Sequence, residues 1–83
     1  MLRIAFSRHA IRALRRMPVN EARRIRAKIE AYARNPAAQA NNVARLRGRD
    51  GYRLRVGDWR VIFERDETTL AILDIGPRGG IYR

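Results

Sequence analysis

Two short runs of alternating residues flank Gly57-Asp58 and restrict the fold more than any other part of the sequence. The run YRLRV precedes this pair and WRVIF follows it. Glycine and aspartate favour the two-residue loop of a tight β-hairpin, in which residue 56 faces residue 59 and residue 55 faces residue 60. Cross-strand partners share a face of the sheet. The sequence therefore predicts an antiparallel hairpin with one apolar face and one basic face.

The apolar face should gather aliphatic and aromatic side chains. Its expected cross-strand pairs are Val56 with Trp59, Leu54 with Val61, and Tyr52 with Phe63. Trp59 could instead stack on an RNA base, as aromatic side chains do in single-stranded recognition. Because the predicted register directs Trp59 to the apolar face, we expect it in the core.

The opposite face carries Arg53, Arg55 and Arg60. The register sets Arg55 directly opposite Arg60, and like charges in that position destabilise a sheet by up to about 1 kcal/mol. A bound phosphate would relieve the repulsion, and local conflicts of this kind tend to occur at functional sites. The alternative is an ordinary solvated face in an arginine-rich chain, which explains its polarity but not its single sign.

The N-terminal part of the chain follows a helical period instead. Alternation over residues 2–6 predicts a strand, and Ser7 is the expected N-cap of a helix that Pro18 ends. A second helix should follow, with Asn20 as its N-cap and Asn35-Pro36 at its end. These patterns predict a helical hairpin.

The remaining segments complete an α+β fold. Residues 36–44 are small and amide-rich and predict a loop, and a turn is expected at residues 48–51. Residues 70–75 are almost all apolar, which is typical of a central strand covered on both faces. The order β-α-α-β-β-β predicts one domain over residues 1–83, with an N-terminal strand and a helical hairpin packed on a small, mostly antiparallel sheet.

The charge of the chain limits its partners. Its 19 lysines and arginines exceed its 8 acidic residues by 11, which is enough to steer a polyanion or an acidic protein toward it. All but one of these cations are arginine, whose planar guanidinium matches phosphate oxygens in pairs, although a GC-rich genome also enriches arginine. The charge indicates a polyanion without saying which one.

The sequence also indicates the cellular compartment in which the protein is expected. It has no cysteine, which excludes disulfides and fits a reducing setting. It has neither the apolar core of a signal peptide nor the roughly 20 apolar residues of a membrane span. An arginine-rich amphipathic start can resemble an organelle transit peptide, but Phe6-Ser7 fits a strand end followed by a helix cap. We therefore expect a cytoplasmic protein with no membrane partner.

A second group of candidate functional residues lies in the C-terminal segment GPRGGIYR. Gly76 and Pro77 should break the last strand and leave Arg78 and Tyr82 just beyond it, near the sheet edge if the tail folds back. A tyrosine so close to a chain end usually serves packing, so Tyr82 by itself indicates no chemistry.

With these features the chain resembles the RelE/ParE superfamily of toxins from bacterial type II toxin–antitoxin systems, above all the RelE-type messenger-RNA endoribonucleases. The likeness extends over nearly the whole length. It includes the helical hairpin, the turn at residues 46–48, the hairpin YRLRVGDWRVIF and a last strand that leads to an arginine and tyrosine tail. The hairpin is its most specific part, because the two helices are generic.

The resemblance implies a site and a reaction. Carried over by position, it implies Arg60, Arg78 and Tyr82 as catalytic residues and Arg53 and Arg55 as RNA-binding residues. The implied reaction is attack by a ribose 2′-hydroxyl on the adjacent phosphate, on the ribosome and without a metal or cofactor. The implied partners are the ribosome, messenger RNA and an acidic or amphipathic antitoxin, which could form a hetero-oligomer with the toxin.

The residue types fit this reaction. A guanidinium is too weak an acid to release its proton readily, so the arginines should orient RNA and neutralise charge on the phosphate. Tyr82 is the tail group that could exchange a proton. The lone histidine, His9, is expected on the surface of the first helix, away from the arginines, and the sequence has no metal-ligand cluster.

Three alternatives remain. A ParE-like inhibitor of DNA gyrase would share the fold and act by binding a protein, with no need of Tyr82 or of converging arginines. A degenerate homologue would bind its antitoxin without catalysis. Pro77, where relatives often have histidine or lysine, and Gly79-Gly80, where polar residues are common, favour this second alternative. A plain nucleic-acid-binding domain fits the charge but not the tail.

Overall fold

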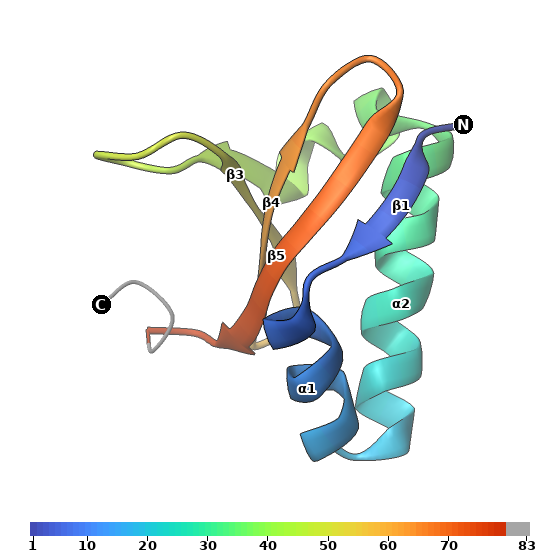
Figure 1. The fold of residues 1–83 in the computed structure, drawn as a ribbon, viewed down its shortest axis with the longest axis vertical. Coiled ribbons are helices and arrows are strands. Elements are labelled where there is room, and N and C mark those ends of the chain that lie inside the picture. Colours follow the sequence, from blue (N-terminus) through green and yellow to red (C-terminus); the bar gives the residue numbers. More distant parts are fainter. Residues whose placement is uncertain (80–83) are drawn as a thin grey trace.

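Two helices cover one face of a five-stranded sheet in the computed structural model, which describes residues 1–79 (Figure 1). The elements are β1 (Arg3–Phe6), α1 (Arg8–Arg16), α2 (Val19–Arg34), the 3-10 helix η1 (Pro36–Asn42), β2 (Val43–Arg45), β3 (Tyr52–Val56), β4 (Trp59–Arg65) and β5 (Thr69–Pro77). The strand order is β1-β5-β4-β3-β2, and β1 pairs parallel with β5 whereas the other pairs are antiparallel. The predicted α+β class and mostly antiparallel sheet are confirmed.

Ser7 starts α1 and ties it to the sheet. Its hydroxyl oxygen accepts a hydrogen bond from the backbone N–H of Ala10 at 3.0 Å and donates one to the carbonyl of Leu73 in β5 at 2.6 Å. The predicted N-cap is therefore confirmed, and the same side chain fixes where the helix meets the sheet. No helix within residues 1–79 is long and apolar enough to cross a membrane.

The predicted N-cap of α2 is wrong. The helix begins at Val19 with Pro18 as its cap, so that Asn20 lies inside the first turn. Pro18 has a φ of −55°, and its carbonyl accepts hydrogen bonds from the N–H groups of Glu21 and Ala22. The helix therefore starts with these backbone hydrogen bonds and without a side-chain cap. The proline ring holds φ close to the helical value.

The segment predicted as a loop is also more ordered than expected. Residues 36–42 form η1, and Val43–Arg45 form the edge strand β2, in which Val43 pairs with Leu54. No residue of η1 is buried, so the helix needs no apolar period that would be visible in the sequence. A strand of three residues is likewise too short to show a clear alternation.

The β3–β4 hairpin has the predicted register. Val56 pairs with Trp59, Leu54 with Val61 and Tyr52 with Phe63, and this face packs against α2 and the other core residues. Phe63 is 1% exposed, and its ring centroid lies 5.0 Å from that of Tyr32 and 5.4 Å from that of Tyr52. Trp59 is half-buried against this core, as predicted.

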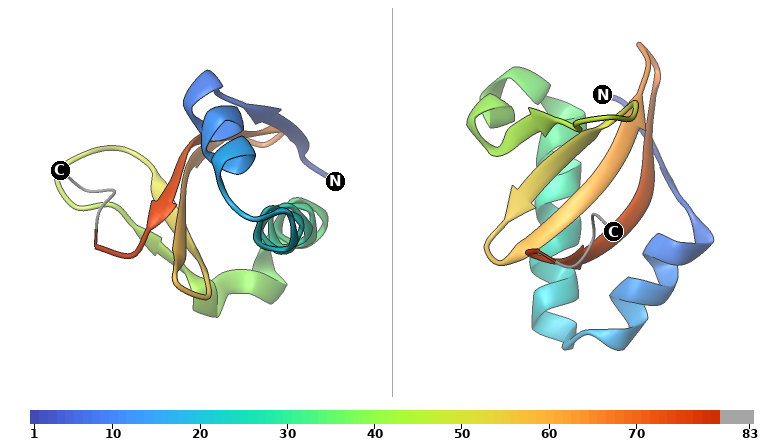
Figure 2. Two further views of the ribbon diagram at one scale, coloured as in Figure 1. Left: turned by 90° about the horizontal axis from the view of Figure 1, so that it is seen from below. Right: turned by 90° about the vertical axis from the view of Figure 1, so that its left-hand side faces the viewer.

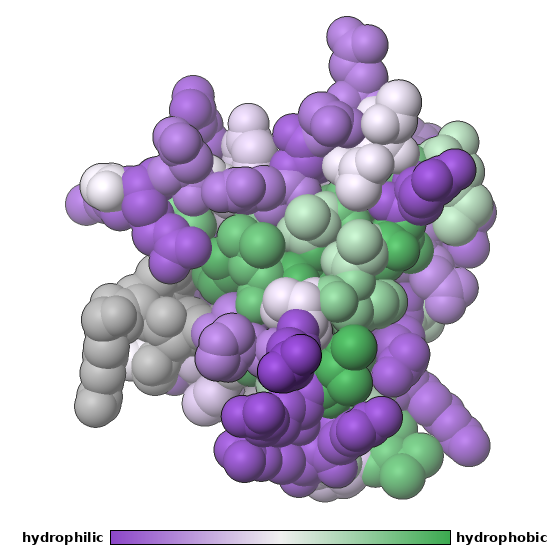
Figure 3. Space-filling model, viewed as in Figure 1, coloured by the Kyte–Doolittle hydropathy of each residue, from purple (hydrophilic) through white to green (hydrophobic). Residues whose placement is uncertain are grey.

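Strand β5 lies between β1 and β4, as predicted for a central strand, but it is not covered on both faces. Its buried residues are Leu70, Ile72, Ile75 and Gly76, and the residues between Leu70 and Ile75 that are not buried are half-buried, because the helices cover one face of the sheet. The right-hand view of Figure 2 looks onto the uncovered face. Figure 3 shows hydrophobic residues exposed over β1 and β5 with hydrophilic residues around them.

A β-bulge accounts for the irregular burial in β5. Phe63 pairs with Ile72 and Ile62 with Asp74, so Leu73 is an extra residue and the buried positions shift by one. The expected break at Gly76-Pro77 is confirmed at Pro77, which pairs with Trp59 as the last residue of the strand and leaves Arg78 just beyond it. Proline is tolerated at strand ends, where fewer ladder hydrogen bonds are needed.

Candidate nucleic-acid interface

The structure brings the three predicted hairpin arginines together on the open face of the sheet. Arg53 and Arg55 are exposed and Arg60 is half-buried, and the three line a hollow of about 120 Å³ beside residues 41–44. We call this the central hollow. The β3–β4 turn positions Arg55 and Arg60 as cross-strand partners, so the predicted shared face exists.

The side chain of Arg60 contains a buried polar atom. Its Nη1 atom is buried and has no hydrogen-bond partner among the residues that the structure describes. A buried donor that lacks a partner costs about 1–3 kcal/mol, and more if it is charged. Within residues 1–79 the one ion pair joins Arg24 to Glu21, so no carboxylate in this part of the chain forms an ion pair with Arg60. An anion bound in the central hollow would satisfy both the charge and the donor.

Arg78 lies in a neighbouring hollow. Its backbone N–H donates a hydrogen bond of 2.7 Å to the carbonyl of Asp58, which ties the end of β5 to the β3–β4 turn. Its side chain is exposed and lines a larger hollow of about 670 Å³ between this turn and α2. We call this the α2 hollow. Arg55 lines both hollows, whereas Arg60 lines only the central one. Tyr82 lies outside the described residues.

A third hollow of about 320 Å³ adjoins the central hollow on its other side. It is lined by Arg45, Leu46, Arg47 and Arg53. Arg53 belongs to both, and the Arg45 guanidinium stands 5.9 Å from the centre of the Tyr52 ring. The three hollows therefore form a continuous row of basic side chains along the β2–β3 side of the molecule.

Sequence reasoning missed several members of this row. Arg45 and Arg47 lie next to the predicted turn, and Arg24 and Lys28 lie on α2. The spacing of Arg24 and Lys28 was a usable signal, because residues four apart share a helix face. Which face of α2 meets the hairpin turn, however, depends on the packing of the two elements.

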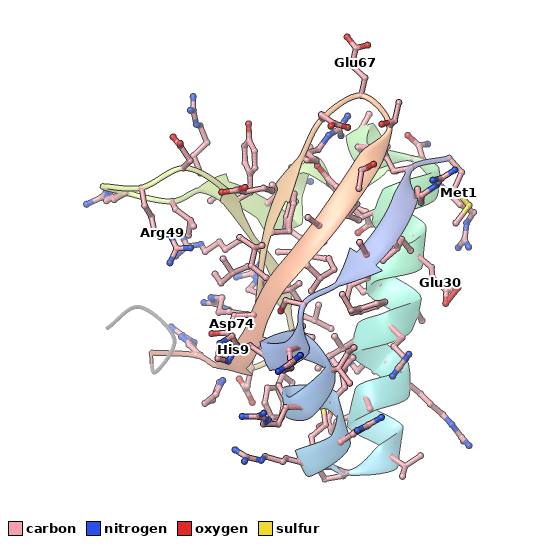
Figure 4. The ribbon with its side chains drawn as sticks, viewed as in Figure 1. Met1, His9, Glu30, Arg49, Glu67 and Asp74 are labelled. Atoms are coloured by element: carbon pink, nitrogen blue, oxygen red, sulfur yellow. The ribbon has the colours of Figure 1, made fainter. Side chains whose placement is uncertain are left out.

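Residues 1–79 contain no group of three His, Asp or Glu side chains that could hold a metal ion. His9 is exposed on α1, as predicted, and Figure 4 shows it away from Arg49 on the loop between β2 and β3. Because guanidinium groups keep their protons near neutral pH, the central hollow can bind and orient a phosphate and stabilise negative charge on it.

The model of the family described as "ParE toxin of type II toxin-antitoxin system, parDE" matches residues 4–82. Among solved structures, the chain is similar to one in the archaeal RelE–RelB complex from Pyrococcus horikoshii OT3, with 28% identity and a TM-score of 0.79 over 95% of this chain and 97% of that chain. No curated protein sequence matches.

Two further similar structures show the fold alone. One is in the RelB–RelE antitoxin–toxin complex from Methanococcus jannaschii, with 23% identity and a TM-score of 0.70 over 99% of this chain and 95% of that chain. The other is in the toxin–antitoxin complex RelBE2 from Mycobacterium tuberculosis, with 23% identity and a TM-score of 0.67 over 93% of this chain and 98% of that chain.

Proposed function

The chain belongs to the ParE toxin family of type II toxin–antitoxin systems, within the RelE/ParE superfamily, and from this premise we propose that it is a toxin that cleaves messenger RNA on the ribosome. The observation that carries the proposal is the Nη1 atom of Arg60, which is buried and has no hydrogen-bond partner within residues 1–79, on a residue directly opposite Arg55. A gyrase inhibitor has no evident use for such a donor, whereas a phosphate in the central hollow would accept its hydrogen bond.

The proposed reaction needs no metal or cofactor. The ribose 2′-oxygen attacks the adjacent phosphorus, a P–O2′ bond forms, and the bond to the 5′-oxygen of the next nucleotide breaks. Arg53 and Arg55 hold the RNA backbone, while Arg60 and Arg78 stabilise the charge that develops on the phosphate. Tyr82, whose role follows from the resemblance, exchanges a proton with the reacting oxygens.

The proposal includes an antitoxin partner. The similar structures are of toxins in complex with antitoxins, and a net charge of +11 would attract an acidic chain. An antitoxin that covered the row of hollows would compete directly with RNA, in a toxin–antitoxin hetero-oligomer. Action on ribosomes would place the protein in the cytoplasm.

Inhibition of DNA gyrase is the second candidate, because the description of the matching family names the ParE toxin. An assay of message cleavage on translating ribosomes, run beside an assay of gyrase supercoiling, separates the two. The chain should cut message and leave gyrase active. Inhibited gyrase with intact message would establish the second candidate, and no effect in either assay would indicate a degenerate antitoxin-binding homologue.

Variants then test the site itself. Arg60→Ala and Tyr82→Phe should both slow cleavage, and Arg12→Ala on α1 is the matched control because Arg12 is exposed and lines none of the three hollows of the row. Removal of one group that stabilises a developing oxyanion typically costs about 10²–10³ in rate. Unchanged cleavage in both variants would overturn the assigned site.

A further inference from the structure

We propose that the α2 hollow binds an RNA phosphate beyond the nucleotides held at the central hollow, so that the strand crosses the β3–β4 turn toward α2. The inference rests on the proposed RNA-cleaving function. It adds the direction in which the strand leaves the cleavage centre and assigns the second phosphate to Arg24 and Lys28. Arg78, which lies beside the turn at Asp58, keeps its proposed role at the cleaved phosphate.

The lining of the α2 hollow is suited to an anion. Four cationic side chains line it, namely Arg24, Lys28, Arg55 and Arg78, and among the described residues Asp58 is its one acidic member. The amide side chains of Gln39 and Asn42 add neutral hydrogen-bonding groups. At about 670 Å³ the hollow is the size of an ordinary ligand site.

The two hollows share part of their walls. Arg55 and Asn42 line both of them, from β3 and from the end of η1. A phosphate at the central hollow and a second one at the α2 hollow could therefore belong to one strand, with Arg55 between them. This continuity is why we assign the α2 hollow to RNA and not to an acidic protein segment.

The hairpin turn holds Arg24 at the mouth of the α2 hollow. A Cβ atom at Gly57 would lie 2.8 Å from Nη2 and 2.9 Å from Nη1 of Arg24, so the guanidinium rests against the bare glycine. Its one carboxylate partner within residues 1–79 is Glu21, at 3.8 Å and on the same helix. Exposed pairs of this kind are weak, so Arg24 remains able to bind a phosphate.

Binding measurements that do not depend on cleavage test the inference. The probes are a dinucleotide and a hexanucleotide of 2′-O-methyl RNA, which cannot undergo attack by the 2′-oxygen, and polyglutamate as an acidic-protein probe. Each is titrated by fluorescence anisotropy at several salt concentrations. Lys28→Gln and Arg24→Gln are compared with Arg23→Gln, which removes the same charge from an exposed position of α2 outside all three basic hollows.

We expect Lys28→Gln and Arg24→Gln each to weaken hexanucleotide binding by about three- to tenfold. Each should also lower the slope of log K against log salt by about 0.7, the value for one phosphate contact on a single strand. Dinucleotide binding should not change, and Arg23→Gln should have little effect on either probe. Thermal melting checks that the variants remain folded.

Three outcomes would overturn the inference. In the first, Lys28→Gln and Arg24→Gln behave like Arg23→Gln while Arg60→Ala weakens both probes, so the proposed function survives alone. In the second, they weaken the dinucleotide as strongly as the hexanucleotide, so the α2 hollow belongs to the cleavage centre. In the third, they weaken binding of polyglutamate but not of RNA, so the hollow serves an acidic protein. If Arg60→Ala also leaves both RNA probes unaffected, the proposed function itself fails.

Discussion

Arg55 and Arg60 are direct cross-strand partners in the β3–β4 hairpin, and the Nη1 atom of Arg60 is buried without a hydrogen-bond partner in residues 1–79. Both features oppose folding in a chain of 83 residues, whose stability margin is small. Conflicts of this kind are expected where function and stability make opposite demands. They give the central hollow two separate experimental signatures, one in stability and one in activity.

Replacing Arg60 with methionine should separate these signatures. Arg60→Met keeps an unbranched apolar stem while it removes the charge and the buried donor, so the free energy of unfolding should rise by about 0.5–1 kcal/mol. Message cleavage should fall by about a hundredfold or more. Urea denaturation and a ribosome cleavage assay measure the two effects, with Arg12→Met as the control. A less stable Arg60→Met protein would show that Arg60 has structural partners.

The cap of α1 gives a prediction about stability alone. Ser7→Ala removes the acceptor for the Ala10 N–H and the donor to the Leu73 carbonyl, so it should lower the free energy of unfolding by about 1–2 kcal/mol. Ser7→Thr keeps the hydroxyl and should recover most of this loss. Equal stability of the alanine variant and the wild-type protein in urea would show that the cap is not needed.

The contact between Gly57 and Arg24 predicts a coupled pair of substitutions. Gly57 has a φ of +59°, and a side chain there would meet the Arg24 guanidinium, so Gly57→Ala should destabilise the protein by about 1–2 kcal/mol. In an Arg24→Ala background the steric part of this cost should disappear and the backbone part should remain. A double-mutant cycle measures the difference, and purely additive effects would contradict the contact.

Asp66 should make the free energy of unfolding depend on pH in the acidic range. Hydrogen bonds from the backbone N–H of Thr68, and then of Thr69, hold the pKa of the Asp66 carboxyl below its ordinary value of 3.8. A lowered carboxyl pKa in the folded state means that the stabilisation is present above 3.8 and is lost as the pH falls through the folded value.

Asp66→Ala should therefore be less stable than the wild-type protein at neutral pH, and the gap should narrow in acid. Denaturation of both proteins across this pH range measures the effect, with Glu67→Ala at the tip of the same turn as the control (Figure 4). A constant gap would show that the carboxylate charge plays no part in the turn.

Local patterns predicted much of the fold. The hairpin register, the Ser7 cap and the end of α2 at Asn35 each depend on residues close in sequence, and all three are confirmed. The misplaced cap of α2 is a local error, whereas two other errors lie where tertiary structure decides. Strand β2 exists because β3 offers it an edge, and the bulge at Leu73 exists because β5 must match β4. Neither requirement is visible within the segment concerned.

The candidate site was predictable to the same extent. The shared face of Arg53, Arg55 and Arg60 follows from one hairpin, so alternation sufficed to find it. The position of Arg78 beside Asp58 and the approach of Arg24 to Gly57 join elements that are distant in sequence. Periodicity within each element cannot reveal such contacts, and the α2 hollow could therefore be found only in three dimensions.

The most direct test of the account is the rate at which message is cut on translating ribosomes by the wild-type protein, Arg60→Met and Arg12→Met. The account predicts specific cuts by the wild-type protein and by Arg12→Met, and a loss of about a hundredfold or more for Arg60→Met although that variant is at least as stably folded. Equal rates for all three proteins, or intact message with every one of them, would contradict it.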